Sequence, residues 1–135
     1  MPGLVAELVA AWNSHDLDQI VNFYAPDYRD SDVAWPVPRR GLEGVRQMMA
    51  MYFRAFPDLY FTAESSLIQG EQIALFWRAQ GTHQGKVMNI PPTGRSIDVR
   101  GTSWLSLTGG KISRAHYVWD VAGLLRQLGL LPELK

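Results

Sequence analysis

The chain contains no cysteine among its 135 residues. This absence excludes disulfide bonds, thiol catalysis and cysteine-bound zinc. Neither sign of charge is in excess, because 13 lysine and arginine residues balance 13 aspartate and glutamate residues. The sequence therefore indicates no basic surface for nucleic acid and no polybasic patch for a membrane, and we expect neither as a partner.

Long apolar runs are also missing. No stretch reaches the roughly 18 consecutive apolar residues of a membrane-spanning helix, and the N-terminal residues lack the features of a signal peptide. We therefore expect a cytoplasmic protein, and the length suits one domain over residues 1–135. Aromatic residues are plentiful, with five each of Trp, Tyr and Phe, and such rings either fill a core or line a cavity.

The spacing of apolar residues changes along the chain from a helical period to a strand period. The predicted helices are Leu4–Trp12, a short helix after a capping Asp16, and Leu42–Phe56. The predicted strands are Tyr28–Trp35, Tyr60–Ile68, Gln72–Thr82 and Ser96–Leu107. Helices followed by a meandering sheet predict an α+β fold, in which three N-terminal helices cover a curved antiparallel (mixed) sheet. Such a cone encloses a cavity if the helices leave its interior unfilled.

The stretch from Gly109 to Gly129, GGKISRAHYVWDVAGLLRQLG, organises the C-terminal part of the chain. A strand in its first half is followed by a short helix, and Asp120 lies at the junction. Because alternate residues of a strand share a face, Asp120 shares one with Val118 and His116. Asp120 could therefore be a polar group in a pocket, and it could equally be the N-cap of the following helix. The two roles can coexist.

Two blocks resemble the SnoaL-like polyketide cyclase family: GTHQGKVMNIPPTGR at residues 81–95 and the stretch at residues 109–129. The opening AWNSHDLDQIVNFYAPDY is similar to the first two helices of that family. The family belongs to the nuclear-transport-factor-2-like superfamily, a cone of curved sheet and three helices that usually dimerises through the sheet. The resemblance therefore implies this cone and a homodimer.

The resemblance also implies an activity. Named enzymes of the family close a ring in aromatic polyketides by intramolecular aldol condensation, without a metal or cofactor, and their acid–base Asp stands at the place of Asp120. We therefore expect a cyclase or isomerase that transfers a proton alpha to a carbonyl of a small hydrophobic molecule. The family often has Trp at the place of His116, Glu at that of Arg114 and Arg at that of Ser106, so the substrate stays open.

The hypothesis for the site makes Asp120 the general base, because an apolar cavity raises the pKa of a carboxyl group. His116 and His83 would act as electrophile or proton relay. The histidines match no metal-ligand spacing, so we expect no metal. The side chains expected to line the cavity are Trp12, Tyr24, Tyr28, Met48, Tyr52, Trp77 and Val118.

Two alternatives remain open at this point. Limonene-epoxide hydrolase, which shares the cone, activates water with an Asp-Arg-Asp set. A similar set of side chains is present here in Asp98, Arg100 and Asp120, so epoxide hydrolysis is one alternative. The third possibility is a protein that binds an apolar ligand without catalysis. An enzyme of the expected kind needs Asp120 to point into the cavity, whereas a binding protein does not.

Overall fold

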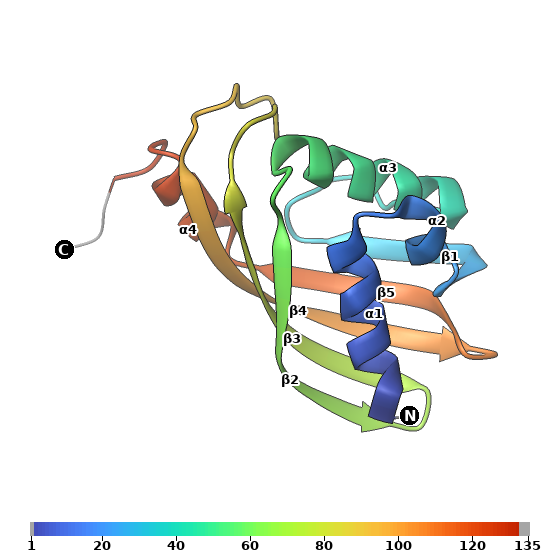
Figure 1. The fold of residues 1–135 in the computed structure, drawn as a ribbon. Coiled ribbons are helices and arrows are strands. Elements are labelled where there is room, and N and C mark those ends of the chain that lie inside the picture. Colours follow the sequence, from blue (N-terminus) through green and yellow to red (C-terminus); the bar gives the residue numbers. More distant parts are fainter. Residues whose placement is uncertain (1, 133–135) are drawn as a thin grey trace.

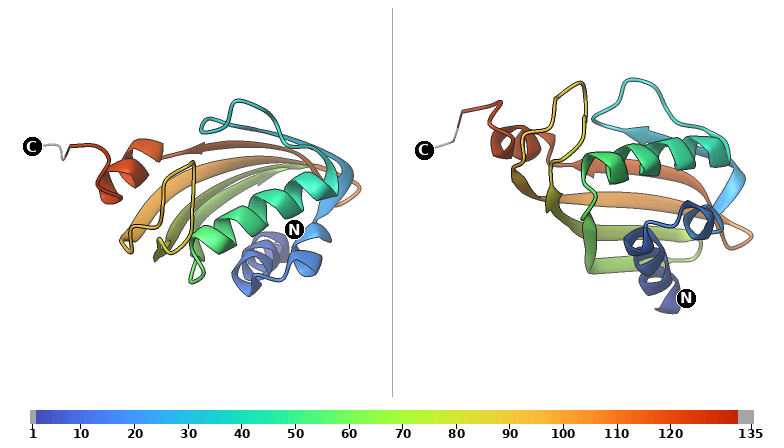
Figure 2. Two further views of the ribbon diagram at one scale, coloured as in Figure 1. Left: turned by 90° about the horizontal axis from the view of Figure 1, so that it is seen from above. Right: turned by 45° about the horizontal axis from the view of Figure 1, so that its top comes forward.

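The computed structural model describes residues 2–132, which form a curved five-stranded sheet with helices on its concave side (Figure 1). The elements in chain order are α1 (Pro2–Ser14), α2 (Leu17–Val21), β1 (Tyr24–Asp32), α3 (Gly41–Ala55), β2 (Tyr60–Gln69), β3 (Gln72–Thr82), β4 (Ser96–Thr108), β5 (Lys111–Trp119) and α4 (Val121–Gln127). Figure 2 shows the sheet arching over α1, α2 and α3, with α4 at the far end of the strands. The expected α+β cone is confirmed. None of the described helices is both long and apolar enough to span a membrane.

The strands lie in the order β1-β5-β4-β3-β2. β2 to β5 form an antiparallel meander, whereas β1 pairs in parallel with β5, so the sheet is mixed. The parallel pairing places Asp32 opposite Tyr117, although 85 residues separate them along the chain. The N-terminal and C-terminal parts of the chain therefore meet at this edge of the sheet.

The second helix begins as its sequence predicts and ends earlier. Asp16 caps α2, because its Oδ1 accepts hydrogen bonds from the backbone N–H groups of Asp18 at 3.0 Å and Gln19 at 3.3 Å. The helical spacing continues to Tyr24, but Tyr24 is the first residue of β1. The carbonyl of Phe23 accepts a bond from the backbone N–H of Ile112 on β5, so tertiary pairing overrides the local preference for helix.

The residues of β5 do not alternate regularly between the two faces of the sheet, because a bulge interrupts the strand. Ser106 of β4 pairs with Arg114 and Leu107 pairs with Ile112, so Ser113 is an extra residue in a β-bulge. Beyond the bulge the odd-numbered residues of β5 face the core, and Tyr117 is buried there. The even-numbered residues face outward, and Val118 is 59% exposed. The expectation that Val118 lines the cavity is therefore wrong, because the bulge moves its face to the outside.

A glycine in the sheet leaves room for the side chains of two tryptophans on the neighbouring strands. Gly101 of β4 pairs with Trp77 on one side and Trp119 on the other. A Cβ atom at Gly101 would lie 2.5 Å from the Trp77 ring and 2.6 Å from the Cβ of Trp119. Only a residue without a side chain leaves room for this aromatic pair, which forms part of the cavity wall described below.

The substitution Gly101→Ala is expected to lower the free energy of unfolding by about 1–3 kcal/mol, because the added methyl group displaces both tryptophans. Chemical denaturation with urea measures this change. Gly3→Ala is the control, since a Cβ there meets its nearest atom, Glu7 Oε1, at an ordinary 3.6 Å. Equal stability of the two variants would contradict the close packing around Gly101.

Candidate active site

A cavity of about 100 Å³ lies between the concave face of the sheet and the helices. Its walls are mainly apolar and rich in aromatic rings, which come from Trp12, Phe56, Phe61, Trp77 and Trp119. The polar side chains that line it are Asp32, Tyr52, Ser103 and Tyr117. Asp32 is the one carboxylate among the lining residues within the described part of the chain. An apolar cavity with few polar groups is typical of a site for a small hydrophobic molecule.

Asp32, the last residue of β1, is held by three donors. Its Oδ1 accepts hydrogen bonds from the backbone N–H of Ala34 at 2.8 Å and the indole N–H of Trp119 at 3.0 Å. Its Oδ2 accepts one from Nη2 of Arg39 at 3.0 Å. The side chain is only 5% exposed. Because a carboxylate oxygen accepts two hydrogen bonds, Oδ2 keeps capacity for a further partner.

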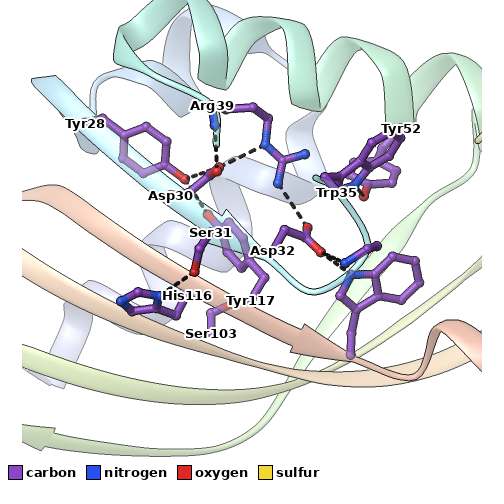
Figure 3. A network of polar contacts seen from close by, with 12 residues as sticks. Tyr28, Asp30, Ser31, Asp32, Trp35, Arg39, Tyr52, Ser103, His116 and Tyr117 are labelled. Carbon is purple, nitrogen blue, oxygen red and sulfur yellow. Dashed lines mark hydrogen bonds and ion pairs between the residues drawn. The ribbon is translucent and has the colours of Figure 1, made fainter. Parts of the chain in front are cut away.

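Arg39 joins Asp32 to a second carboxylate, that of Asp30 (Figure 3). Its Nε donates to Asp30 Oδ2 at 2.9 Å, and its backbone N–H donates to Asp30 Oδ1, also at 2.9 Å. Burial opposes the charge of the guanidinium, but the attraction and hydrogen bonds of Asp30 and Asp32 outweigh this and raise the pKa of Arg39. The loop that carries Arg39 is thereby fastened to β1.

Two tyrosines extend this network toward the cavity wall. The hydroxyl of Tyr28 donates to Asp30 Oδ2 at 2.9 Å and lies 2.9 Å from the hydroxyl of Tyr117. Since the single hydrogen of Tyr28 is used on Asp30, Tyr117 donates to Tyr28. Burial raises the pKa of Tyr117 well above its usual value, so this hydroxyl keeps its proton.

Two further hydroxyls in the wall each accept a hydrogen bond from a tryptophan. The indole N–H of Trp35 donates to Tyr52 at 3.0 Å, and that of Trp77 donates to Ser103 at 2.8 Å. Burial raises the pKa of Tyr52 to about 12, so its hydroxyl is protonated at neutral pH. Within residues 2–132 neither hydroxyl donates its own hydrogen to a protein group.

Asp120 lies outside this cavity. Its side chain is exposed, and its Oδ1 accepts a hydrogen bond from the backbone N–H of Gly123 at 2.8 Å, which caps α4. Of the two roles expected for Asp120, the structure shows the cap. Its role as a general base stays a prediction.

Neither histidine of the hypothesis is among the residues that line the cavity. His116 is exposed on the outer face of the sheet, where its Nδ1 lies 2.6 Å from Ser31 Oγ. His83 is fully buried behind Phe56, and its Nδ1 accepts a bond from the backbone N–H of Thr93 at 3.2 Å. The structure therefore does not bring Asp120, His116 and His83 together. Within the described chain no group of three or more His, Asp or Glu side chains is placed to hold a metal ion.

Several of the side chains expected in the cavity wall are found there, namely Trp12, Met48, Tyr52 and Trp77. Tyr24 and Tyr28 are buried beside the wall, where Tyr24 accepts a hydrogen bond from Trp12. The expected Asp-Arg-Asp set does not form. Asp98 pairs with Arg78 at 2.5 Å and Arg100 pairs with Glu64 at 3.0 Å, and within the described residues Arg100 forms no ion pair with Asp98 or Asp120.

The sequence hypothesis missed Asp32, Arg39, Ser103 and Tyr117 as residues of the site. One signal for Asp32 was present, because Asp30 and Asp32 alternate on one face of a predicted strand. Two carboxylates on the buried face of a strand require a cation nearby, and the next cations in the chain are Arg39 and Arg40. The sequence thus indicates an ion-paired cluster but not its position on the cavity.

Comparisons with known proteins agree with this architecture. The chain is 26% identical to nogalonic acid methyl ester cyclase of Streptomyces nogalater over 124 residues, which cover 90% of this chain and 92% of that protein. Its structure is similar to that of AclR of Streptomyces galilaeus, with a TM-score of 0.86, 30% identity and coverage of 99% of this chain and 87% of that one. TsrD of Streptomyces laurentii also gives a TM-score of 0.86, with 26% identity and coverage of 96% and 95%. Residues 4–128 match the family described as SnoaL-like polyketide cyclase, and the chain belongs to that family.

Proposed function

We propose that the chain catalyses proton transfer alpha to a carbonyl of a small hydrophobic molecule bound in the cavity, without a cofactor, as a cyclase or isomerase. The observation that carries this proposal is the position of Asp32, a carboxylate in an otherwise mainly apolar wall. The relative of this chain from Streptomyces nogalater is named as a cyclase, which supports chemistry of this class.

Asp32 is the general base in this proposal. Its Oδ2 accepts one hydrogen bond, from Arg39, and has a further lone pair for a proton from the substrate. Proton transfer to Asp32 removes the charge of that carboxylate, but Arg39 stays paired with Asp30. The reaction therefore leaves no unpaired buried cation, a state that is costly in a protein interior.

The resulting enolate requires a hydrogen-bond donor at its oxygen. Tyr52 lines the cavity, keeps its proton at neutral pH and has its hydrogen available. The proton on Asp32 then returns to another atom of the same substrate, which gives isomerisation. Alternatively, the enolate carbon attacks a second carbonyl and closes a ring, and the alkoxide formed from that carbonyl takes up the proton from Asp32. Both outcomes use one base and neutral hydroxyl donors and consume no second reagent.

We expect the protein to accelerate exchange of the α-hydrogens of 2-indanone for deuterium in D₂O, measured by mass spectrometry. Asp32→Asn should lower this acceleration by at least ~100-fold, because general-base catalysis typically contributes about 10²–10⁴ in rate. The matched control is Asp120→Asn, since Asn is as good an N-cap as Asp and preserves the start of α4. Its exchange rate should stay close to that of the unmodified protein.

Two results would contradict this assignment. Loss of exchange in Asp120→Asn with retention in Asp32→Asn would make Asp120 the base, as the sequence hypothesis has it. Binding of 2-indanone without any acceleration of exchange by the unmodified protein would favour the non-catalytic binding function.

A second candidate is epoxide hydrolysis, favoured by one observation. The structure contains an Asp-Arg-Asp set different from the expected one, formed by Asp30, Arg39 and Asp32. Asp32 would take a proton from a water molecule, whose oxygen attacks an epoxide carbon and breaks its C–O bond, and the alkoxide oxygen of the opened ring takes up the proton held by Asp32. Conversion of indene oxide to its diol, dependent on Asp32, with no deuterium exchange into 2-indanone, would select this candidate.

We also propose that the chain pairs with a second copy through the outer face of the sheet. Three large apolar side chains on neighbouring strands are exposed there: Phe76 by 40%, Trp104 by 56% and Val118 by 59%. Large apolar side chains exposed on one face of a sheet are typical of an interface, and the resemblance to the family implies pairing through the sheet.

The substitution Trp104→Glu is expected to convert a dimer to a monomer, because it places a charge in the proposed contact. Sedimentation equilibrium measures the change from twice the mass of the chain to the mass of one chain. Val37→Glu is the control, since Val37 is 71% exposed on the loop before α3. A monomeric unmodified protein, or a dimer that survives Trp104→Glu, would overturn this interface.

A further inference from the structure

We infer that the hydroxyl group of Ser103 donates a hydrogen bond to the carbonyl oxygen of the ligand and so fixes its orientation in the cavity. This inference rests on the proposed function, because it assigns a residue to the ligand of the same cavity. Ser103 belongs to β4, lines the cavity and is 1% exposed. Its position on a central strand makes it more rigidly placed than the groups on the loop before α3.

The hydrogen bonds of Ser103 leave one donor unused. Its Oγ accepts a hydrogen bond from the indole N–H of Trp77 at 2.8 Å. A serine hydroxyl also carries one hydrogen, and within residues 2–132 no group accepts it. Since buried donors are unfavourable without a partner, an oxygen atom in the cavity gains a bond that the protein alone does not make.

Trp77 holds the Ser103 hydroxyl in place and makes it a stronger hydrogen-bond donor. Its N–H is used on Ser103, so it holds the Oγ in place and does not itself compete for the ligand. A hydroxyl that accepts a hydrogen bond also becomes a stronger donor, because the two bonds polarise one another. The pair therefore acts as one directed O–H group in a mainly apolar wall.

The sheet register places this donor in line with the proposed base. Asp32 pairs with Tyr117, and Tyr117 pairs with Ser103, so the three residues form one row across β1, β5 and β4. Two strand spacings separate the backbones of Asp32 and Ser103, about 10 Å. All three side chains line the cavity, and Figure 3 shows Ser103 beside Tyr117, its neighbour in this row.

A ligand in this cavity then has a defined orientation. The neighbouring row contains Trp119, Gly101 and Trp77, which form an aromatic surface without a side chain between the two rings. A flat ligand packs against this surface with its carbonyl oxygen toward Ser103 and an adjacent C–H group toward Asp32. The site is thereby specific for ketones over hydrocarbons of the same shape.

Binding of 2-indanone and indane to the protein separates this role from packing, because the two probes differ in the carbonyl group. Titration calorimetry should show that Ser103→Ala weakens 2-indanone binding by about three- to tenfold, the range of one net hydrogen bond, and leaves indane binding unchanged. Infrared spectroscopy should show a lowered C=O stretching frequency for bound 2-indanone, and Ser103→Ala should abolish this shift.

The control is Ser106→Ala, which removes the same atom from the outer face of the same strand, where Ser106 bonds to Gln72. It should change neither affinity nor the stretching frequency. If Ser103→Ala does not fold, Ser103→Cys serves in its place, because a thiol leaves no empty space at this position and donates only weakly. It should weaken 2-indanone binding and reduce the frequency shift.

Equal weakening of both probes by Ser103→Ala would make the residue a packing element and overturn the inference. An unchanged affinity and frequency for 2-indanone would overturn it as well. In either case Asp32-dependent deuterium exchange would leave the proposed function intact. Conversely, a Ser103-dependent frequency shift without exchange in the unmodified protein would support the inference and contradict the proposed catalysis.

Discussion

The ion pairs of Arg39 with Asp30 and Asp32 are the interaction on which the site depends. The Asp30 and Asp32 side chains are 1% and 5% exposed, and that of Arg39 is 15% exposed. Removing one member of such a buried pair typically costs about 3–5 kcal/mol, because its partner keeps an uncompensated charge. The cluster also holds the proline-containing loop before α3 against the end of β1. The cluster therefore fixes the position of Asp32 at the cavity.

Hydrogen bonds from tryptophan N–H groups also hold side chains of the site in place. Each of the five tryptophans, all within the described residues, donates its indole N–H to a side-chain oxygen, and the acceptors are Tyr24, Tyr52, Ser103, Gln72 and Asp32. The rings thus supply apolar surface while their polar atoms are satisfied inside the protein. Of the hydroxyls that accept these bonds, those of Tyr52 and Ser103 line the cavity, and their own hydrogens stay available for a ligand. A mainly apolar cavity thereby acquires a small number of directed donors.

Local patterns predicted much of the fold, because strand alternation and helix caps depend on neighbouring residues. The bounds of β3, its buried face, the cap at Asp16 and the possible cap at Asp120 could all be read from the sequence. The site could not, for two reasons. The bulge at Ser113 reverses which residues of β5 face inward, and a single extra residue leaves no clear mark in composition. Asp32 reaches the cavity through parallel pairing of β1 with β5, a long-range contact that no local spacing specifies.

The central claim is that Asp32 and the aromatic cavity together bind and activate a carbonyl compound. A crystal structure of the protein with 2-indanone tests it most directly. The account predicts the ring of the ligand against Trp77, its oxygen at hydrogen-bond distance from a hydroxyl of the wall, and a methylene carbon about 3–3.5 Å from Asp32 Oδ2. A ligand bound beside Asp120 on the outer face, or a cavity that contains none at saturating concentration, would contradict it.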